Sequence, residues 1–113
     1  MTIPREGCLL RIFIGESDQW EGRPLYEAIV LKAREMHLAG ATVLRGPMGF
    51  GANSRLHTVK VLRLSEDLPM VIEIVDSRAK IDELLPHIEQ MVKEGMITLE
   101  RVEVIQYRGK QPQ

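Results

Sequence analysis

The six residues M-V-I-E-I-V at positions 70–75 form the stretch that decides the fold. Apolar and β-branched side chains dominate it, which is typical of a β-strand. Met70, Ile72 and Ile74 would face one side of a sheet, because successive side chains of a strand point to opposite faces. Two of the three intervening residues are valines. The stretch therefore predicts a central strand that is apolar on both faces.

Residues 9–14, L-L-R-I-F-I, predict a second strand of the same kind. Alternating or β-branched patterns predict three more strands, at residues 41–45, 57–64 and 97–107. The strand at residues 57–64 follows a glycine-rich loop, and we treat it as an accessory to that loop.

Two stretches with apolar residues at helical spacing separate these strands. The first covers residues 24–39, and Gly40 is expected to stop it. The second begins after Ser77, a plausible N-cap, and is expected to end near Gly95. Pro86 interrupts the second stretch, so we expect a kink or a broken first half.

Without the accessory strand the order of elements is βαββαβ, which predicts an α+β ferredoxin-like sandwich in a single domain over residues 1–113. In that plan two helices cover one face of an antiparallel sheet. The other face also needs cover, because the strands at residues 9–14 and 70–75 are apolar on both sides. A second copy of the chain is expected to supply that cover.

The composition is that of a globular protein, with 44% apolar and 27% charged residues. No stretch reaches the roughly 20 apolar residues of a membrane-spanning helix, and the N-terminus lacks the apolar region of a secretory signal. We therefore expect a cytoplasmic protein. Cys8 is the single cysteine, which excludes an internal disulfide and predicts a buried strand thiol.

Charge is distributed unevenly along the chain, although the net charge is only -1 and argues against nucleic-acid binding. Residues 36–65 contain no aspartate or glutamate but include Arg45, Arg55, Lys60 and Arg63. An uncompensated positive stretch of this kind favours a site for something negative.

Gly46, Gly49 and Gly51 lie within this positive stretch. Glycine lets backbone N–H groups turn toward an anion without interference from a Cβ atom. No Gly-Lys-Ser/Thr follows and no helix opens after the cluster, so it is neither a Walker loop nor a dinucleotide fingerprint. The alternative interpretation is a flexible connection between two strands.

The histidines His37, His57 and His87 lack the spacing of a helical metal pair. His57, beside the glycines, is the one that could act as a base, so a small enzyme acting on an anionic substrate remains an alternative. A metal-binding trimer of the copper-tolerance type is a second alternative. RNA binding is disfavoured, because Phe13 is the single aromatic residue in a predicted central strand.

Several motifs resemble the family catalogued as domain of unknown function 190. They include L-R-I-F-I-G-E-S-D at residues 10–18, G-A-T-V-L-R-G at 40–46, G-F-G-A-N-S-R-L-H-T at 49–58 and V-I-E-I-V-D at 71–76. The resemblance extends from about residue 9 to residue 107. That family is PII-like and related to the nitrogen regulatory PII signalling proteins.

The resemblance implies a homotrimer that binds adenine nucleotides between subunits and signals through a loop after the second core strand. It also implies a membrane transporter or channel as partner. Gly40 and Thr42 resemble the G-x-T-V that opens the second strand, and Gly49 with Gly51 resembles the G-x-G that begins the loop. Lys60 would lie at the far side of that loop.

Gly95 resembles the glycine that opens the loop after the second helix, and Arg108 resembles a phosphate-facing arginine. M-I-T-L follows Gly95, without the second glycine and lysine of PII proteins, and Gln106 replaces another arginine. These departures favour a nucleotide with fewer phosphates or another small anion.

The sequence thus predicts a regulator rather than an enzyme, with no metal and no resident cofactor. The expected ligand-binding residues are Gly40, Thr42, Arg45, Gly46, Gly49, Gly51, Arg55, His57, Lys60, Gly95 and Arg108.

Overall fold

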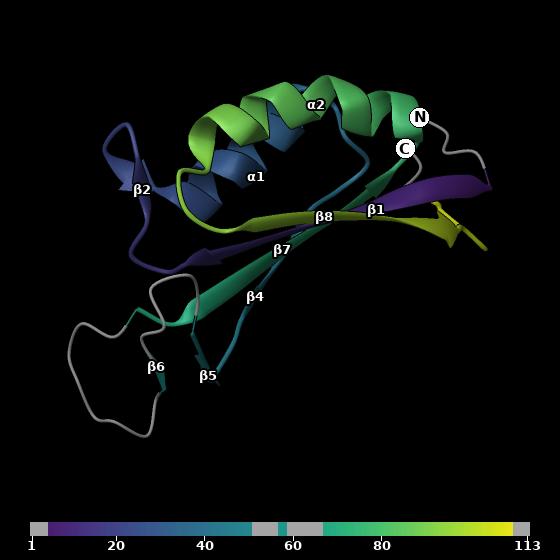
Figure 1. Ribbon diagram of the computed structural model, residues 1–113. Helices are drawn as coiled ribbons and strands as arrows, with labels where there is room; N and C mark the ends of the chain where they lie inside the picture. Colours follow the sequence, from purple (N-terminus) through teal and green to yellow (C-terminus); the bar gives the residue numbers. More distant parts are fainter. Residues whose placement is uncertain (1–4, 51–56, 59–66, 110–113) are drawn as a thin grey trace.

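A four-stranded antiparallel sheet with two helices on one face forms the molecule (Figure 1). The computed structural model describes residues 5–50, 57–58 and 67–109. The sheet order is β4-β7-β1-β8, in which β1 (Glu6–Gly15) and β7 (Pro69–Asp76) are central. The edge strands are β4 (Thr42–Arg45) and β8 (Met96–Glu103). This arrangement confirms the ferredoxin-like α+β fold that the sequence predicts.

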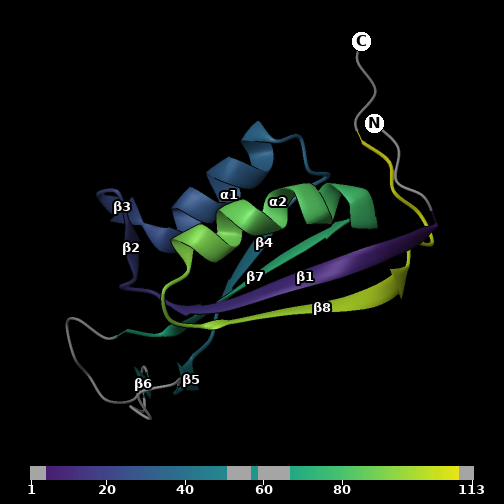
Figure 2. The same ribbon diagram turned by 45° about the horizontal axis from the view of Figure 1, so that its top comes forward.

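The two helices are α1 (Leu25–Glu35) and α2 (Arg78–Met91), and Figure 2 shows them side by side above the sheet. They cover the face to which the even residues of β1 and β7 point. Leu10, Ile12, Ile72 and Ile74 have no exposed surface there. Cys8 is buried as well, which confirms the expected strand thiol. The core is therefore a single layer between helices and sheet.

The uncovered face of the sheet is also rich in apolar side chains. Register places Leu9 opposite Val75 and Phe13 opposite Val71 on this side, and Leu44 pairs with Val71 from β4. Phe13 is 37% exposed and Leu44 50% exposed. The prediction that these strands are apolar on both faces is confirmed.

Helix α1 ends four residues earlier than expected, and the predicted stop at Gly40 is wrong. His37 takes the left-handed backbone conformation, with φ of 64°, directly after the C-cap Met36. The ammonium of Lys80 on α2 donates a hydrogen bond of 2.8 Å to the carbonyl oxygen of Met36. Gly40 is therefore free of any capping role and belongs to the segment that enters β4.

Helix α2 starts as predicted, because the Ser77 side chain accepts a hydrogen bond from the backbone N–H of Lys80. It runs without interruption through Pro86, so the expected broken first half is wrong. Leu84 and Ile88 on either side of the proline are fully buried. Their packing on the sheet offsets the one hydrogen bond that proline removes.

Two short hairpins complete the described structure. Strands β2 (Gln19–Trp20) and β3 (Arg23–Pro24) pair across a two-residue turn, where Glu21 and Gly22 have φ of 48° and 83°. Strands β5 (Met48–Gly49) and β6 (His57–Thr58) pair within the region expected to be a loop and a longer strand. Most of the strand predicted at 57–64 lies outside the described residues. No helix in the described ranges is long and apolar enough to cross a membrane.

Gly95 illustrates where the fold requires glycine. Its φ is 148°, and a Cβ atom at this position would overlap the carbonyl oxygen of Phe13 on β1. We predict that Gly95→Ala lowers the free energy of unfolding by about 1–3 kcal/mol, because the loop from α2 to β8 must move away from β1.

Gly40→Ala is the matched control, since a Cβ atom there meets nothing within 4 Å. It should leave the free energy of unfolding unchanged or raise it by up to about 1 kcal/mol. Urea unfolding at equal protein concentrations measures both variants. Equal stability of the two would contradict the assigned conformation of Gly95.

Candidate functional site

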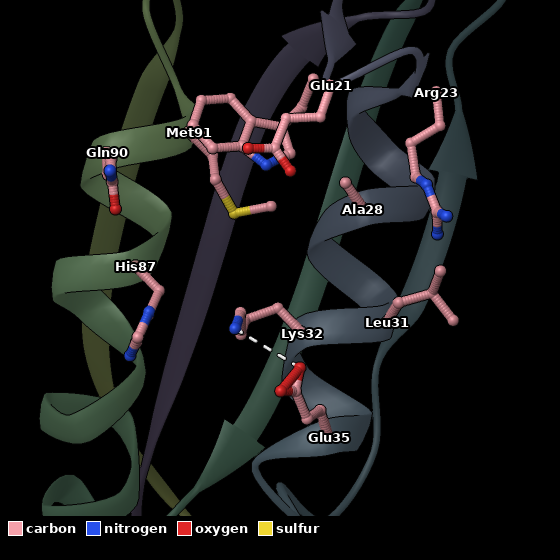
Figure 3. A pocket seen from close by; sticks show the side chains of 10 residues that line it. Glu21, Arg23, Ala28, Leu31, Lys32, Glu35, His87, Gln90 and Met91 are labelled. Atoms are coloured by element: carbon pink, nitrogen blue, oxygen red, sulfur yellow. Dashed lines mark hydrogen bonds and ion pairs between the residues drawn. The ribbon is translucent and has the colours of Figure 1, made fainter.

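The described residues line a groove and a pocket on the surface. A groove of about 420 Å³ lies between α1 and α2, and a pocket of about 310 Å³ lies at one end of the sheet. Figure 3 shows the groove, where Lys32 and Glu35 of α1 form an ion pair of 3.4 Å and His87 approaches from α2. Its lining includes none of the residues that the sequence predicts for ligand binding.

The pocket at the end of the sheet contains two of the predicted residues, Gly40 and Thr42. Three stretches that are distant in sequence form its walls. They are the entry to β4, the second half of β7 and the segment after β8, which contribute Ala39, Gly40, Ala41, Thr42, Glu73, Val75, Val104, Gln106 and Tyr107.

Asp76 holds the entry to β4 in place. The residue is buried, with 2% exposure, and its carboxylate accepts hydrogen bonds from the backbone N–H of Ala39 at 2.9 Å and of Ser77 at 2.7 Å. The Tyr107 hydroxyl donates to the carbonyl oxygen of Ala39 at 3.1 Å. The wall of the pocket is thus tied both to the core and to the C-terminal segment.

The pocket combines apolar walls with polar groups at its border. Val75 and Val104 supply apolar surface, whereas Thr42 and Gln106 supply a hydroxyl and an amide. Gly40 leaves open space where a side chain would stand. The neighbouring β4 is an edge strand, so its outward backbone groups are not used by the four-stranded sheet. This combination suits a planar ring with a hydrogen-bonding edge.

Glu73 connects the pocket to the centre of the uncovered sheet face. Glu73 lines the pocket, and its carboxylate accepts a hydrogen bond of 2.8 Å from Nε of Arg11. The same guanidinium donates to Glu100 on β8 at 2.6 Å. The hydrogen bond to Glu73 is the main reason why the pKa of Arg11 lies above its ordinary value.

The predicted residues of the glycine-rich loop lie at the other end of β4. The backbone N–H of Gly46 donates to the carbonyl of Pro69 at 2.8 Å, and a Cβ atom on Gly46 or Gly49 would come within 2.9 or 3.0 Å of the Pro69 ring. Neither glycine has a positive φ. Their lack of a side chain serves close packing on Pro69 in this structure.

Arg45 is not uncompensated, contrary to what the acid-free stretch suggests. Its guanidinium forms an ion pair of 2.9 Å with Glu16, which follows β1. The fold therefore brings an acidic residue from outside residues 36–65 to this charge. The pairing also gives Glu16 a structural role, and Asp18 accepts a hydrogen bond from the backbone of Gly15 at 3.0 Å.

The remaining predicted residues divide between the same two ends. Gly95 lies beside β1 at the loop end of the sheet, and exposed Arg108 follows Tyr107 at the pocket end. The backbone of His57 pairs with Gly49. Gly51, Arg55 and Lys60 lie outside the described residues. A single chain thus holds one group of predicted residues at each end of β4 and does not join them.

Sequence reasoning missed Glu73, Asp76, Val104 and Tyr107. The V-I-E-I-V-D motif already contained a signal, since a carboxylate within a strand and another at its end require partners. No such signal marks Val104 or Tyr107, which the sequence predicts to lie in the last strand. That strand ends at Glu103, and the following residues turn toward Ala39. The described residues contain no group of three potential metal ligands.

Comparisons of sequence identify related proteins. The family model described as DUF190, Uncharacterized ACR, matches residues 7–104. A UPF0166 protein of Aquifex aeolicus is 42% identical over 97 residues, which cover 86% of this chain and 91% of that protein. A UPF0166 protein of Methanocaldococcus jannaschii is 32% identical over 103 residues, covering 90% and 93% of the two chains.

Comparisons of structure identify PII-like proteins. CPII, a nitrogen regulatory PII-like protein from Thiomonas intermedia K12, superimposes with a TM-score of 0.62 at 16% identity and 88% coverage of both chains. The GlnK-ATP complex of B. subtilis gives 0.57 at 13% identity, covering 89% and 85%. The divalent ion tolerance protein CutA1 of Ehrlichia chaffeensis gives 0.55 at 10% identity, covering 90% and 84%. These similarities establish the shared fold.

The role of Asp76 is tested by Asp76→Asn. An amide has a single acceptor oxygen, so one of the two backbone N–H groups would face an NH₂ group instead. We predict a loss of about 1–3 kcal/mol in the free energy of unfolding. Amide hydrogen exchange should also become faster at Ala39, whose N–H would lose its partner.

Asp82→Asn is the control, since Asp82 is exposed and pairs with Arg78 one helical turn away. Its cost should stay below about 0.5 kcal/mol. If Asp76→Asn is no more harmful than Asp82→Asn, the carboxylate does not hold the pocket wall.

Proposed function

This chain belongs to the DUF190 family, as its motifs predict, and from that premise we propose that it is a PII-like homotrimeric regulator rather than an enzyme. It binds a small anionic effector, an adenine nucleotide, in clefts between subunits. Binding in the cytoplasm changes the surface that the loop after β4 presents to a partner protein. A membrane transporter or channel is the partner that we propose.

One observation carries this proposal: residues of the sheet face that the helices leave uncovered line part of the pocket. Glu73 and Val75, which line the pocket, belong to the odd positions of β7 and point away from the helices. Half-buried or exposed apolar side chains continue across the same face. A second copy packed there would bury that apolar surface and would form an additional wall of the pocket.

Division of the predicted residues between two ends of the sheet supports a shared site. The pocket end offers apolar walls and a polar border, and the loop end holds Arg45 with Gly46 and Gly49. If the loop end of one subunit lies against the pocket end of the next, the base of a nucleotide and its phosphates are held by different subunits. A monomer would then bind the base alone, with low affinity.

An adenine nucleotide suits the pocket for two reasons. The planar base fits between apolar residues such as Val75 and Val104, and its hydrogen-bonding edge can meet backbone groups near Gly40. CPII was solved with ADP, AMP and bicarbonate, and GlnK was solved with ATP. The sequence departs from PII proteins near Gly95 and at Gln106, which favours a nucleotide with fewer phosphates than ATP.

Phosphate binding would have to compete with an existing ion pair. Arg45 already contacts Glu16, and its side chain is 59% exposed. An exposed pair of this kind stabilises the fold by no more than about 1 kcal/mol. A diphosphate can therefore recruit Arg45 at small cost, and Glu16→Gln should strengthen rather than weaken nucleotide binding.

Gly40→Val tests the pocket directly. A Cβ atom at Gly40 meets open space, so valine should enter the pocket without disturbing the packing around it. We predict that this variant keeps its melting temperature but loses the rise that ADP causes in the wild type, because the base no longer fits. Calorimetric titration with ADP should show affinity at least tenfold weaker, and Gly40→Ala should show a smaller loss.

Gln90→Val on α2 serves as the control, since Gln90 lines the groove between the helices and not this pocket. It should bind ADP as the wild type does. Full ADP affinity in Gly40→Val would place the nucleotide elsewhere.

A matched pair of leucines tests assembly through the uncovered face. Leu44 on this face is 50% exposed, and Leu31 on α1 is 39% exposed. We predict that Leu44→Lys dissociates the trimer, because a lysine ammonium would lose its hydration between packed sheets. Leu31→Lys, on the helix side, should remain trimeric in sedimentation velocity. Identical sedimentation of the two variants would refute assembly through the sheet.

A further inference from the structure

Glu73 belongs to two features at once, because it lines the pocket and contacts Arg11 at the centre of the uncovered sheet face. Arg11 donates to Glu73 at 2.8 Å and to Glu100 at 2.6 Å, and together the three side chains bridge β7, β1 and β8. We call these three residues the Arg11 triad. A ligand that bonds to the Glu73 carboxylate would therefore change the charge environment of the sheet face.

The Arg11 triad carries one excess negative charge, since two carboxylates share one guanidinium. Among the described residues that point to this face by register, Arg11 is the single basic residue. Its cross-strand partner on β8 is Thr98, and the partner of Glu73 on β4 is Thr42, both uncharged. Among the described strand residues of this face, none therefore compensates the excess charge.

Covering this face with a second copy would remove water from the triad. The side chains of Arg11 and Glu73 are only 37% and 31% exposed before any partner is added, whereas that of Glu100 is 56% exposed. Desolvation of an excess charge opposes association, because a buried charge must be paired and hydrogen-bonded. The apolar side chains around the triad favour association. The charge of the triad opposes it, because it raises the free energy of association at the centre of the interface.

We propose that a ligand in the pocket and association of the sheet faces stabilise each other through Glu73. The inference rests on the proposed function, in which an adenine nucleotide occupies this pocket. The nucleotide carries hydrogen-bond donors on its amino group and ribose hydroxyls. A donor directed at Glu73 provides a second partner for the carboxylate and reduces the cost of covering the triad.

Coupling of this kind is reciprocal, because both equilibria involve the same carboxylate. If the nucleotide strengthens association by a given factor, association strengthens nucleotide binding by the same factor. Effector concentration would then control how much of the protein is assembled at low protein concentration. Ligand binding in the pocket would thus affect the neighbouring copy through Arg11 as well as through the loop after β4.

Glu73→Gln is the decisive variant, because glutamine keeps the shape and the acceptor oxygen for Arg11 while it removes the excess charge. Sedimentation of labelled protein over a dilution series, with and without ADP, gives the association constants. In the wild type, ADP should strengthen association about fivefold or more, within the usual range of coupling between sites. Without ADP, Glu73→Gln should associate more tightly than the wild type, and ADP should strengthen its association by a smaller factor than in the wild type, because only the phosphate contacts between subunits remain.

Glu103→Gln is the charge-matched control, since Glu103 pairs with Arg5 and its side chain is 60% exposed. This variant should behave as the wild type in both conditions. The inference is overturned if ADP binds the wild type in calorimetry but leaves its association unchanged, or if Glu73→Gln retains the full effect of ADP.

The same experiment distinguishes a failure of the proposed function from a failure of this inference. If the wild type binds no ADP at all, the nucleotide assignment is wrong. The charge argument is then still decided by the protein alone, because Glu73→Gln must associate more tightly than both the wild type and Glu103→Gln. Equal association of all three would refute it.

Discussion

The structure depends on a sheet that is apolar on both faces but covered by helices on one. Leu10 and Ile12 of β1 lie fully buried beneath α1 and α2, and the alternate residues Leu9 and Phe13 point to the uncovered side. Successive side chains of a strand point to opposite faces of the sheet. The same apolar stretch therefore produces both the face buried beneath the helices and the apolar face that remains uncovered. A second copy of the chain satisfies this constraint most simply, and it would place the pocket at the contact between subunits.

The candidate site follows from that arrangement rather than from a conspicuous motif. Its walls come from the ends of strands and from the segment after β8, and Asp76 fixes one wall from within the core. Gly46 and Gly49 also pack against Pro69, a contact that the sequence does not predict. Arg45 and Gly46 lie at the far end of β4. In the proposed assembly, a complete site therefore needs two subunits.

The sequence was sufficient to predict the fold, the main strands and the two apolar faces, because alternation and helical spacing are local properties. Features that depend on contacts between residues far apart in the sequence could not be predicted from it. Helix α1 ends at Glu35 because His37 accepts a left-handed conformation and Lys80 caps Met36 from another helix. Arg45 meets Glu16 across 29 positions of sequence. The Tyr107 hydroxyl donates a hydrogen bond to Ala39, which lies 68 positions earlier in the sequence.

A crystal structure of the protein with ADP would test the central claim most directly. The account predicts three chains around a common axis, with each adenine ring against Gly40 and Val75 of one chain and each diphosphate near Arg45 of its neighbour. A nucleotide held by a single chain, or bound in the groove between α1 and α2, would contradict it. Sheet faces open to solvent in that crystal would contradict it as well.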